Sequence, residues 1–364
     1  MGDRKNREDM IQSSILTGNG VWHMESKNKI ACIQWLRIFA AAAVVVMHTV
    51  AVVWNRTPME AAPWKILTVY DALVRWPVPV FAMITGALFL PRKTELKTVL
   101  TRYIPRMFFL FVLWSGLYVR YRYLHGLPAE KLWVEFANGQ YHLWYLPFLC
   151  GVYLTLPFLQ KIAEDERLTA QLLAVSLTVG SAIPWGLDLW ALLCPDWAPV
   201  FASIKNHLNF SFFFDLLFAL VLGHWLMGRE FTVRGRRLLY GAGILSLILT
   251  VTGTLHLSAW AGKPVTLFFS HSAPTSLCAA AALFVFAKYN LTRLPRLVDG
   301  LAKSSFGVYL GHALLIEHLY DVQLHALTWD VRWSVPAVAL LVYLVCAAAA
   351  ALIRKIPVVG KLLV

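Results

Sequence analysis

Residues 35–54 read WLRIFAAAAVVVMHTVAVVW, an apolar segment of membrane-spanning length that contains one arginine and one histidine. At about 1.5 Å rise per residue, an α-helix over this segment covers about 28 Å, close to the roughly 30 Å hydrocarbon thickness of a bilayer. Trp35 and Trp54 bracket the segment and are expected to lie at the two membrane interfaces. The segment therefore predicts a membrane-spanning helix near the start of the chain.

Arg37 and His48 are expected to face the same way on this helix. At about 100° per residue, the step from one to the other makes about three turns and places the two side chains on one face, about 16 Å apart. Ionisable groups are costly in hydrocarbon and are kept where they face the interior of a helix bundle. The pattern predicts a polar stripe and a functional site at Arg37 and His48.

Structural roles remain open for both residues. An imidazole can accept a proton from a hydroxyl near neutral pH, but His48 could instead form a structural hydrogen bond to a neighbouring helix. Arg37 could pair with an anionic ligand that arrives from the cytosol, or it could extend to lipid phosphates.

The composition places the whole chain in the same class. Of 364 residues, 59% are hydrophobic and 15% are charged, and the mean hydropathy is +0.60, as in helical membrane proteins. We expect an all-α, polytopic transmembrane bundle at 30–353, between cytosolic tails at 1–29 and 354–364. Its spanning helices are predicted from ten apolar windows, near 30–54, 66–90, 103–119, 142–160, 169–190, 210–227, 238–258, 265–287, 304–320 and 335–353.

The net charge of +13 is explained by topology. With the N-terminus in the cytosol, the cytosolic segments hold 22 of the 33 Lys and Arg residues, whereas the outward segments hold seven. Positive residues mark the cytosolic side, so both termini are predicted there, and the charge requires no nucleic-acid partner. The five cysteines have no CxxC spacing, which supports neither a disulfide framework nor a metal site.

A basic segment follows the second predicted helix. It reads PRKTELKTVLTRYIPRM at 91–107 and contains Arg92, Lys97, Arg102 and Arg106. Arg102 and Arg106 are four residues apart and are expected to share a helix face. Guanidinium groups bind phosphate bidentately, so this surface could hold a phosphorylated cofactor, although it also fits plain anchoring at the cytosolic face.

The second predicted helix carries charged residues ahead of two prolines. Each of Pro77 and Pro79 removes a backbone donor, so the helix is expected to be interrupted there. Asp71 and Arg75 are four residues apart just before this break. They fit a satisfied intramembrane ion pair, and a catalytic couple is the alternative.

Two later segments supply further candidates for substrate binding. His142 and Trp144 lie in the aromatic cluster YHLWY at 141–145, which suits a sugar ring and also an interfacial belt. His312 is in the middle of SSFGVYLGHALLIEHLY at 304–320, and Glu317 lies five residues on, about 140° around the helix, so the two do not share a face. Additional polar lining is expected from His207, His224, His271 and Asp215.

Together these residues resemble the acyltransferase-3 family of integral membrane acyltransferases. The spacing from Arg37 to His48 is similar to the first-helix signature of that family. Three further segments resemble family motifs in the family order: PVPVFAMITGALFL at 77–90, HLWYLPFLCGVYL at 142–154 and SFGVYLGHALLIE at 305–317.

The resemblance implies transfer of an acetyl group from cytosolic acetyl-CoA to a carbohydrate hydroxyl at the outer face of the bacterial inner membrane. It implies that Arg37 and His48 are the catalytic pair, and that Arg102 and Arg106 occupy the place of a basic motif. Acetyl-CoA is then the acyl donor, with no metal, and the acceptor is a surface polysaccharide or its lipid-linked precursor. Two other functions stay open: export of a glycan or lipid-linked sugar, and acyl transfer to a peptide or an antibiotic.

Overall fold

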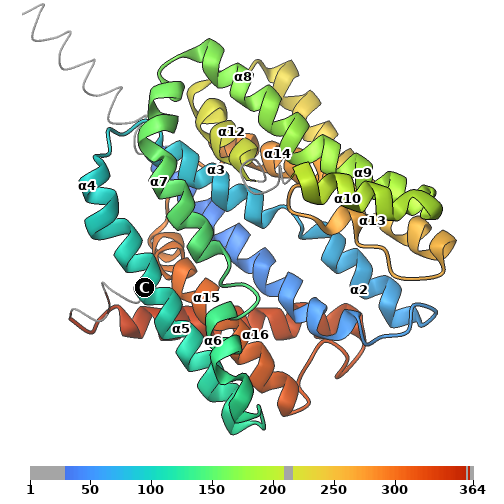
Figure 1. Ribbon diagram of the computed structural model, residues 1–364. Coiled ribbons are helices and arrows are strands. Elements are labelled where there is room, and N and C mark those ends of the chain that lie inside the picture. Colours follow the sequence, from blue (N-terminus) through green and yellow to red (C-terminus); the bar gives the residue numbers. More distant parts are fainter. Residues whose placement is uncertain (1–28, 209–215, 358–359, 361–364) are drawn as a thin grey trace, which may run out of the picture.

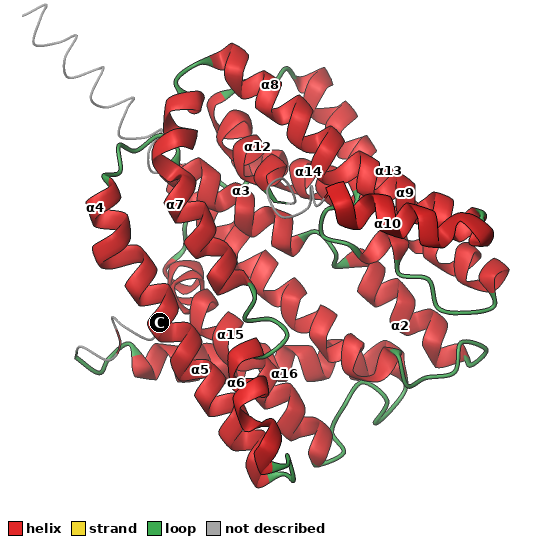
Figure 2. Ribbon diagram, in the orientation of Figure 1, coloured by secondary structure: helices red, strands yellow, loops and turns green. Residues whose placement is uncertain are grey.

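The computed structural model of the protein describes residues 29–208, 216–357 and 360, and these residues form helices joined by short connections, with no strand among them (Figure 2). The all-α prediction is confirmed for this part of the chain. Nearly all of the predicted N-terminal tail, the start of the predicted span at 210–227, Asp215 and part of the C-terminal tail lie outside the described residues.

The first half of the chain begins with the helix that carries Arg37 and His48. Its long helices and the short 3₁₀ and π turns between them are Lys29–Trp54, α2 (Ala62–Leu73), α3 (Pro77–Phe89), α4 (Leu96–Thr98), a π turn (Val99–Tyr103), α5 (Ile104–Leu124), a 3₁₀ turn (Ala129–Lys131), α6 (Leu132–Asn138), α7 (Tyr145–Ala163), α8 (Glu166–Leu177), a π turn (Thr178–Ala182), α9 (Ile183–Leu193), a 3₁₀ turn (Pro195–Trp197) and α10 (Ala198–Leu208).

The second half completes the bundle. Its elements are α12 (Leu217–Gly228), α13 (Val233–Ala261), a 3₁₀ turn (Leu267–Phe269), α14 (Pro274–Asn290), α15 (Arg296–Asp321) and α16 (Val331–Ile353). Seven helical stretches of the described chain are long and apolar enough to cross a membrane. The predicted count of ten spans and the cytosolic position of both termini stay predictions.

The Lys29–Trp54 helix runs through the middle of the bundle, with α3 on one side and α15 and α16 on the other (Figure 1). Its residues Ala41 and Val45 are buried against Val308 of α15 and Val338 of α16. A helix that is covered on several sides can hold polar groups away from lipid, because its neighbours line the space around them. The position of this helix therefore accounts for the polar stripe.

Trp54 does not lie at a lipid interface as the sequence predicts. It is only 4% exposed, its ring stacks on Trp64, and its indole N–H donates a 2.9 Å hydrogen bond to the Thr68 hydroxyl. Because α2 packs across this end of the first helix, the indole meets protein and not headgroups.

The predicted interruption of the second span is confirmed. α2 ends at Leu73, and α3 begins with Pro77 at its first position, where the missing N–H costs no helical hydrogen bond. The carbonyl of Leu73 accepts a 2.8 Å hydrogen bond from the indole of Trp76. Arg75 lies in the non-helical link between the two half-helices.

Two glycines set the close packing of α3 on α12. A Cβ on Gly86 would collide with the backbone of Leu220, and a Cβ on Gly223 would collide with the backbone of Met83. Small residues allow such close backbone approach between membrane helices. These two close contacts therefore fix the position of α3 on α12. α3 also forms one wall of the internal space described below.

We expect Gly86→Ala and Gly223→Ala to lower the stability of the folded protein by about 1–3 kcal/mol each, because an added methyl group must push two backbones apart. Thermal unfolding of the purified protein in detergent measures this. Gly151→Ala in α7 is the matched control, since a Cβ there meets nothing within 4 Å. Equal melting temperatures for all three variants would contradict the packing argument.

Candidate active site

Arg37 lines a cavity of about 370 Å³ inside the bundle, here called the arginine chamber. Arg106 of α5 and Lys303 of α15 line it as well, so three cationic side chains from three helices converge on one space. The Arg37 guanidinium donates a 3.1 Å hydrogen bond to Gln34, and Arg106 lies with its guanidinium carbon 5.9 Å from the ring centre of Phe306. The chamber is suited to an anionic, elongated ligand.

His48 lines a second cavity of about 180 Å³, here called the histidine chamber. His142, Trp144 and His271 also line it, and the Trp144 ring stacks on His271 at 5.2 Å between centres. Arg75, from the break between α2 and α3, is the lining residue with a permanent positive charge.

The two chambers meet at three aromatic residues, Phe81, Tyr145 and Tyr309, which line both of them. We call these three the aromatic partition. The ring centres lie 6.3 Å apart for Phe81 and Tyr145, and 6.2 Å apart for Tyr145 and Tyr309. Tyr309 is fixed by its hydroxyl, which donates a 2.7 Å hydrogen bond to the carbonyl of His142. Arg37 and His48 therefore lie in adjacent spaces that share a wall only one ring thick.

Three histidine rings and a tyrosine ring form a cluster at His48, and two of them, His48 and His142, line the histidine chamber. The His48 ring stacks on His312 at 5.2 Å between centres and lies 6.4 Å from His142, while His142 and His312 are 4.8 Å apart. Tyr141 contacts His48 at 4.8 Å. These rings come from the first helix, from the turn before α7 and from α15, so three separate segments supply one cluster.

His312 has a defined proton position. Its Nδ1 lies 3.0 Å from the carbonyl of Val308 and 2.8 Å from that of Tyr309, so Nδ1 carries the proton and Nε2 is left as an acceptor. Nε2 is buried and has no hydrogen-bond partner. An acceptor nitrogen is thus present beside His48, in a side chain with no solvent exposure.

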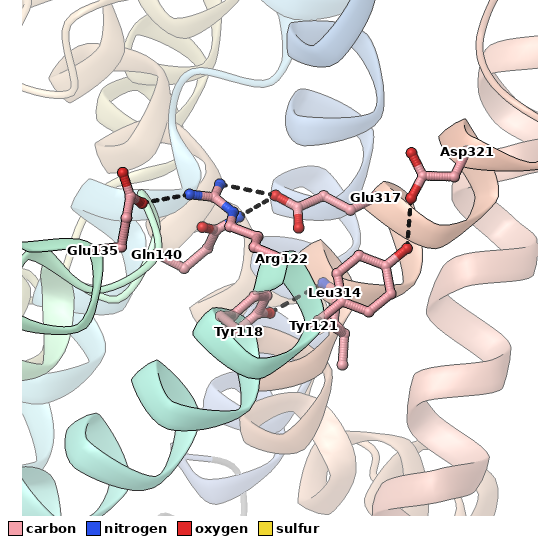
Figure 3. A network of polar contacts seen from close by, with 8 residues as sticks. All are labelled: Tyr118, Tyr121, Arg122, Glu135, Gln140, Leu314, Glu317 and Asp321. Atoms are coloured by element: carbon pink, nitrogen blue, oxygen red, sulfur yellow. Dashed lines mark hydrogen bonds and ion pairs between the residues drawn. The ribbon is translucent and has the colours of Figure 1, made fainter. Parts of the chain in front are cut away.

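Tyr118 of α5 supports the turn of α15 that carries His312. Its hydroxyl donates a 2.9 Å hydrogen bond to the carbonyl of Leu310. It also accepts a hydrogen bond of 3.1 Å from the N–H of Leu314 (Figure 3). These two groups are the acceptor and donor of a single helical turn. A side chain that bridges them holds α15 in place on either side of His312.

Glu317 belongs to a separate polar network near the C-terminal ends of α5 and α15. It accepts a 3.1 Å hydrogen bond from Arg122 and a 2.5 Å hydrogen bond from Gln140, and Arg122 also pairs with Glu135 at 2.7 Å (Figure 3). Glu317 lines an open cleft of about 710 Å³ with Asp321 and not the histidine chamber. The expected separation of Glu317 from His312 around the helix agrees with this placement.

The predicted basic surface is only partly at the arginine chamber. Arg106 lines the chamber, whereas Arg92, Lys97 and Arg102 are exposed and do not line it. The backbone is a π turn over Val99–Tyr103, just before α5, so the count of about 100° per residue from Arg102 to Arg106 does not hold. The shared face predicted for these two arginines therefore does not bring both to the chamber.

Other residues at the site had no separate signal in the sequence. Lys303 reads as an ordinary basic residue near a helix end, and Phe81 and Tyr309 read as core aromatics, whereas Tyr145 belongs to the aromatic cluster at 141–145 that the sequence singles out. Only the packing of α3, α7 and α15 around the first helix brings them together. Among the described residues, no group of three or more His, Cys, Asp and Glu side chains is placed to hold a metal ion.

The fold and the two chambers define a helical membrane protein in which a cation-lined cavity adjoins a cavity lined by histidines, with three aromatic residues shared between them. The sequence model of the acyltransferase-3 family, described as an acyltransferase domain, matches residues 30–354. The chain belongs to this family and is therefore a membrane acyltransferase. Neither a curated protein nor a solved structure matches the chain.

We expect Tyr118→Phe to destabilise the protein by about 1–3 kcal/mol, because two backbone groups of α15 lose a buried partner. Denaturation of the purified protein measures the change. Tyr123→Phe, on the same helix but 53% exposed, serves as the control and is expected to leave stability unchanged. If both variants unfold alike, the bridge to α15 has no energetic role.

Proposed function

We propose that the protein is an acetyl-CoA-dependent O-acetyltransferase of the bacterial inner membrane, which acetylates a hydroxyl of a surface polysaccharide or of its lipid-linked precursor. As the particular reaction, we propose one like that of the enzyme that O-acetylates enterobacterial common antigen, because the layout of the sequence motifs resembles that enzyme. The observation that carries the proposal is the pair of adjoining chambers, with Arg37 in one and His48 in the other.

The arginine chamber suits the donor. Acetyl-CoA carries phosphates at one end and a thioester at the end of a flexible arm, so it needs cations near the membrane surface and a passage beyond them. Arg37, Arg106 and Lys303 supply positive charge, and guanidinium groups bind phosphate bidentately. The exposed Arg92, Lys97 and Arg102 extend the positive surface outside the chamber, where the nucleotide would lie.

The histidine chamber suits the reaction. In direct transfer, the hydroxyl oxygen attacks the thioester carbonyl, His48 takes the hydroxyl proton, and that proton passes to the sulfur as the carbon–sulfur bond breaks. In the covalent route, a ring nitrogen of His48 attacks the thioester carbonyl, the carbon–sulfur bond breaks and the CoA thiolate leaves. The acceptor hydroxyl then attacks the acetyl group on His48, the bond to the ring nitrogen breaks, and the hydroxyl proton passes to the thiolate. His312 stacks on His48, and the alignment of the imidazole contributes to either route.

Aromatic rings at the histidine chamber support a carbohydrate acceptor. Trp144 and Tyr141 adjoin the His48 chamber, and rings of this kind stack on the apolar faces of sugars. The open cleft lined by Glu317, Arg122 and Asp321 offers hydrogen-bonding groups for the hydroxyls of the acceptor. A protein that only exports a glycan has no need of a thioester site, so binding of acetyl-CoA separates the two functions.

Acetyl-CoA is expected to raise the melting temperature of the purified protein, because a ligand that binds only the folded state stabilises it. Arg106→Ala should weaken this binding about tenfold or more, since one charge-assisted contact is lost, and Arg102→Ala should weaken it less. Lys131→Ala, an exposed cation in the loop after α5, is the control. A protein that acetyl-CoA does not stabilise would favour the export function.

His48→Ala is expected to abolish acetyl transfer, by a factor of about 10² or more, while membrane insertion stays normal, because a small apolar residue carries no burial cost. Transfer of radiolabelled acetyl groups to surface glycans measures it. His256→Ala, an exposed histidine of α13, is expected to keep full activity. Retained transfer in His48→Ala would remove this residue from the mechanism.

A single turnover with radiolabelled acetyl-CoA and no acceptor separates the two chemical routes. Labelled protein after rapid quench indicates the covalent route, and unlabelled protein indicates direct transfer.

A further inference from the structure

Arg75 stands at the junction between the histidine chamber and the exterior. It lines the histidine chamber and also an open cleft of about 660 Å³ on the far side, here called the Arg75 cleft. Phe269 is the other residue that lines both spaces. A ligand that passes from this cleft toward His48 therefore meets the Arg75 guanidinium.

The protein holds the Arg75 guanidinium in a fixed place. One terminal nitrogen pairs with Asp71, and the other donates a 3.3 Å hydrogen bond to the carbonyl of Phe269. The guanidinium carbon also lies 4.0 Å above the Phe269 ring. Because Arg75 belongs to the non-helical link between α2 and α3, its side chain is not confined to a helix face.

The pair is incompletely satisfied. Two polar atoms of the pair are buried and have no hydrogen-bond partner: the second carboxylate oxygen of Asp71 and the Nε of Arg75. Asp71 is only 1% exposed. Unpaired buried polar atoms are costly, and they persist mainly where function uses them. The cleft beside them is polar, and its lining includes Asn55, Asp188, Lys263 and Ser270.

We propose that Arg75 is the acceptor-binding residue at the threshold of the histidine chamber, where it binds two neighbouring oxygens of a sugar ring and so presents one hydroxyl to His48. Asp71 is a positioning residue, because it orients the guanidinium. The planar fork of an arginine matches a pair of adjacent oxygens, as it matches carboxylate and phosphate. This inference rests on the proposed acetyl transfer, and it adds the site and the substrate class of the acceptor.

The test uses the full-length protein in lipid nanodiscs and a panel of methyl glycosides as probes. Binding is followed by saturation-transfer NMR, and acetyl transfer from acetyl-CoA is followed separately. Removal of Arg75 alone would leave Asp71 as a buried, unpaired carboxylate. The main variant is therefore Asp71→Asn with Arg75→Gln, which removes both charges together.

We expect this double variant to bind the glycosides at least tenfold more weakly, and to show a correspondingly higher KM for them, while acetyl-CoA stabilises it as it does the unaltered protein. Arg75→Lys should also lose most of the binding, since an ammonium group cannot bind two oxygens in a fork. The unaltered protein should lose affinity for a monodeoxy glycoside that lacks one of the two oxygens, and the double variant should not distinguish the two probes.

Asp196→Asn is the control, because Asp196 is an exposed carboxylate of the Pro195–Trp197 turn and does not line the Arg75 cleft. Equal glycoside affinity in the double variant and the unaltered protein would overturn the assignment of Arg75, whether or not acetyl transfer occurs. Glycoside binding that depends on Arg75, without any transfer from acetyl-CoA, would support the site and refute the proposed reaction. Loss of acetyl-CoA stabilisation in the double variant would mean that Arg75 serves the donor, which also overturns the inference.

Discussion

The break in the second span, between Leu73 and Pro77, is the constraint on which the interior depends. Two prolines withhold backbone donors, so the chain cannot continue as one helix, and inside a membrane protein the freed groups must find partners. The indole N–H of Trp76 donates a hydrogen bond to the Leu73 carbonyl. Arg75, which lies within the break, pairs with Asp71 and donates a hydrogen bond to the carbonyl of Phe269. A local rule of backbone chemistry therefore places a guanidinium beside the histidine chamber.

The sequence predicts the parts of this arrangement that follow from helical periodicity. The separation of His312 from Glu317 comes from counting residues along one helix, and the break comes from the two prolines. The common face of Arg37 and His48 rests on the same kind of count and stays a prediction. Contacts between helices do not follow from such counts, which is why the aromatic partition and the role of Lys303 appear only in the structure. The π turn before α5 is a further limit, because it breaks the periodicity on which the pairing of Arg102 with Arg106 rests.

One face of α3 packs closely against α12, and the opposite face lines the two chambers. On one face, Gly86 brings its backbone against Leu220 of α12, so this half-helix has a close-packed backing. On the other face, Phe81 reaches between the two chambers, where it meets Tyr145. A helix fixed along one side gives its opposite side chains a constant position, and the place of the partition is thus set by the packing of α3 on α12.

In the proposed reaction, the partition would also help to keep the thioester away from bulk water. Acetyl transfer to a sugar competes with transfer to water, so the reacting carbonyl must be kept from bulk water until the acceptor is in place. Phe81, Tyr145 and Tyr309 separate the cation-lined space from the histidine cluster, and Arg75 stands at the opposite boundary of that cluster. With a barrier of rings on the proposed donor side and a charged threshold on the proposed acceptor side, the proposed reaction would bring the two reactants together in the small volume beside His48.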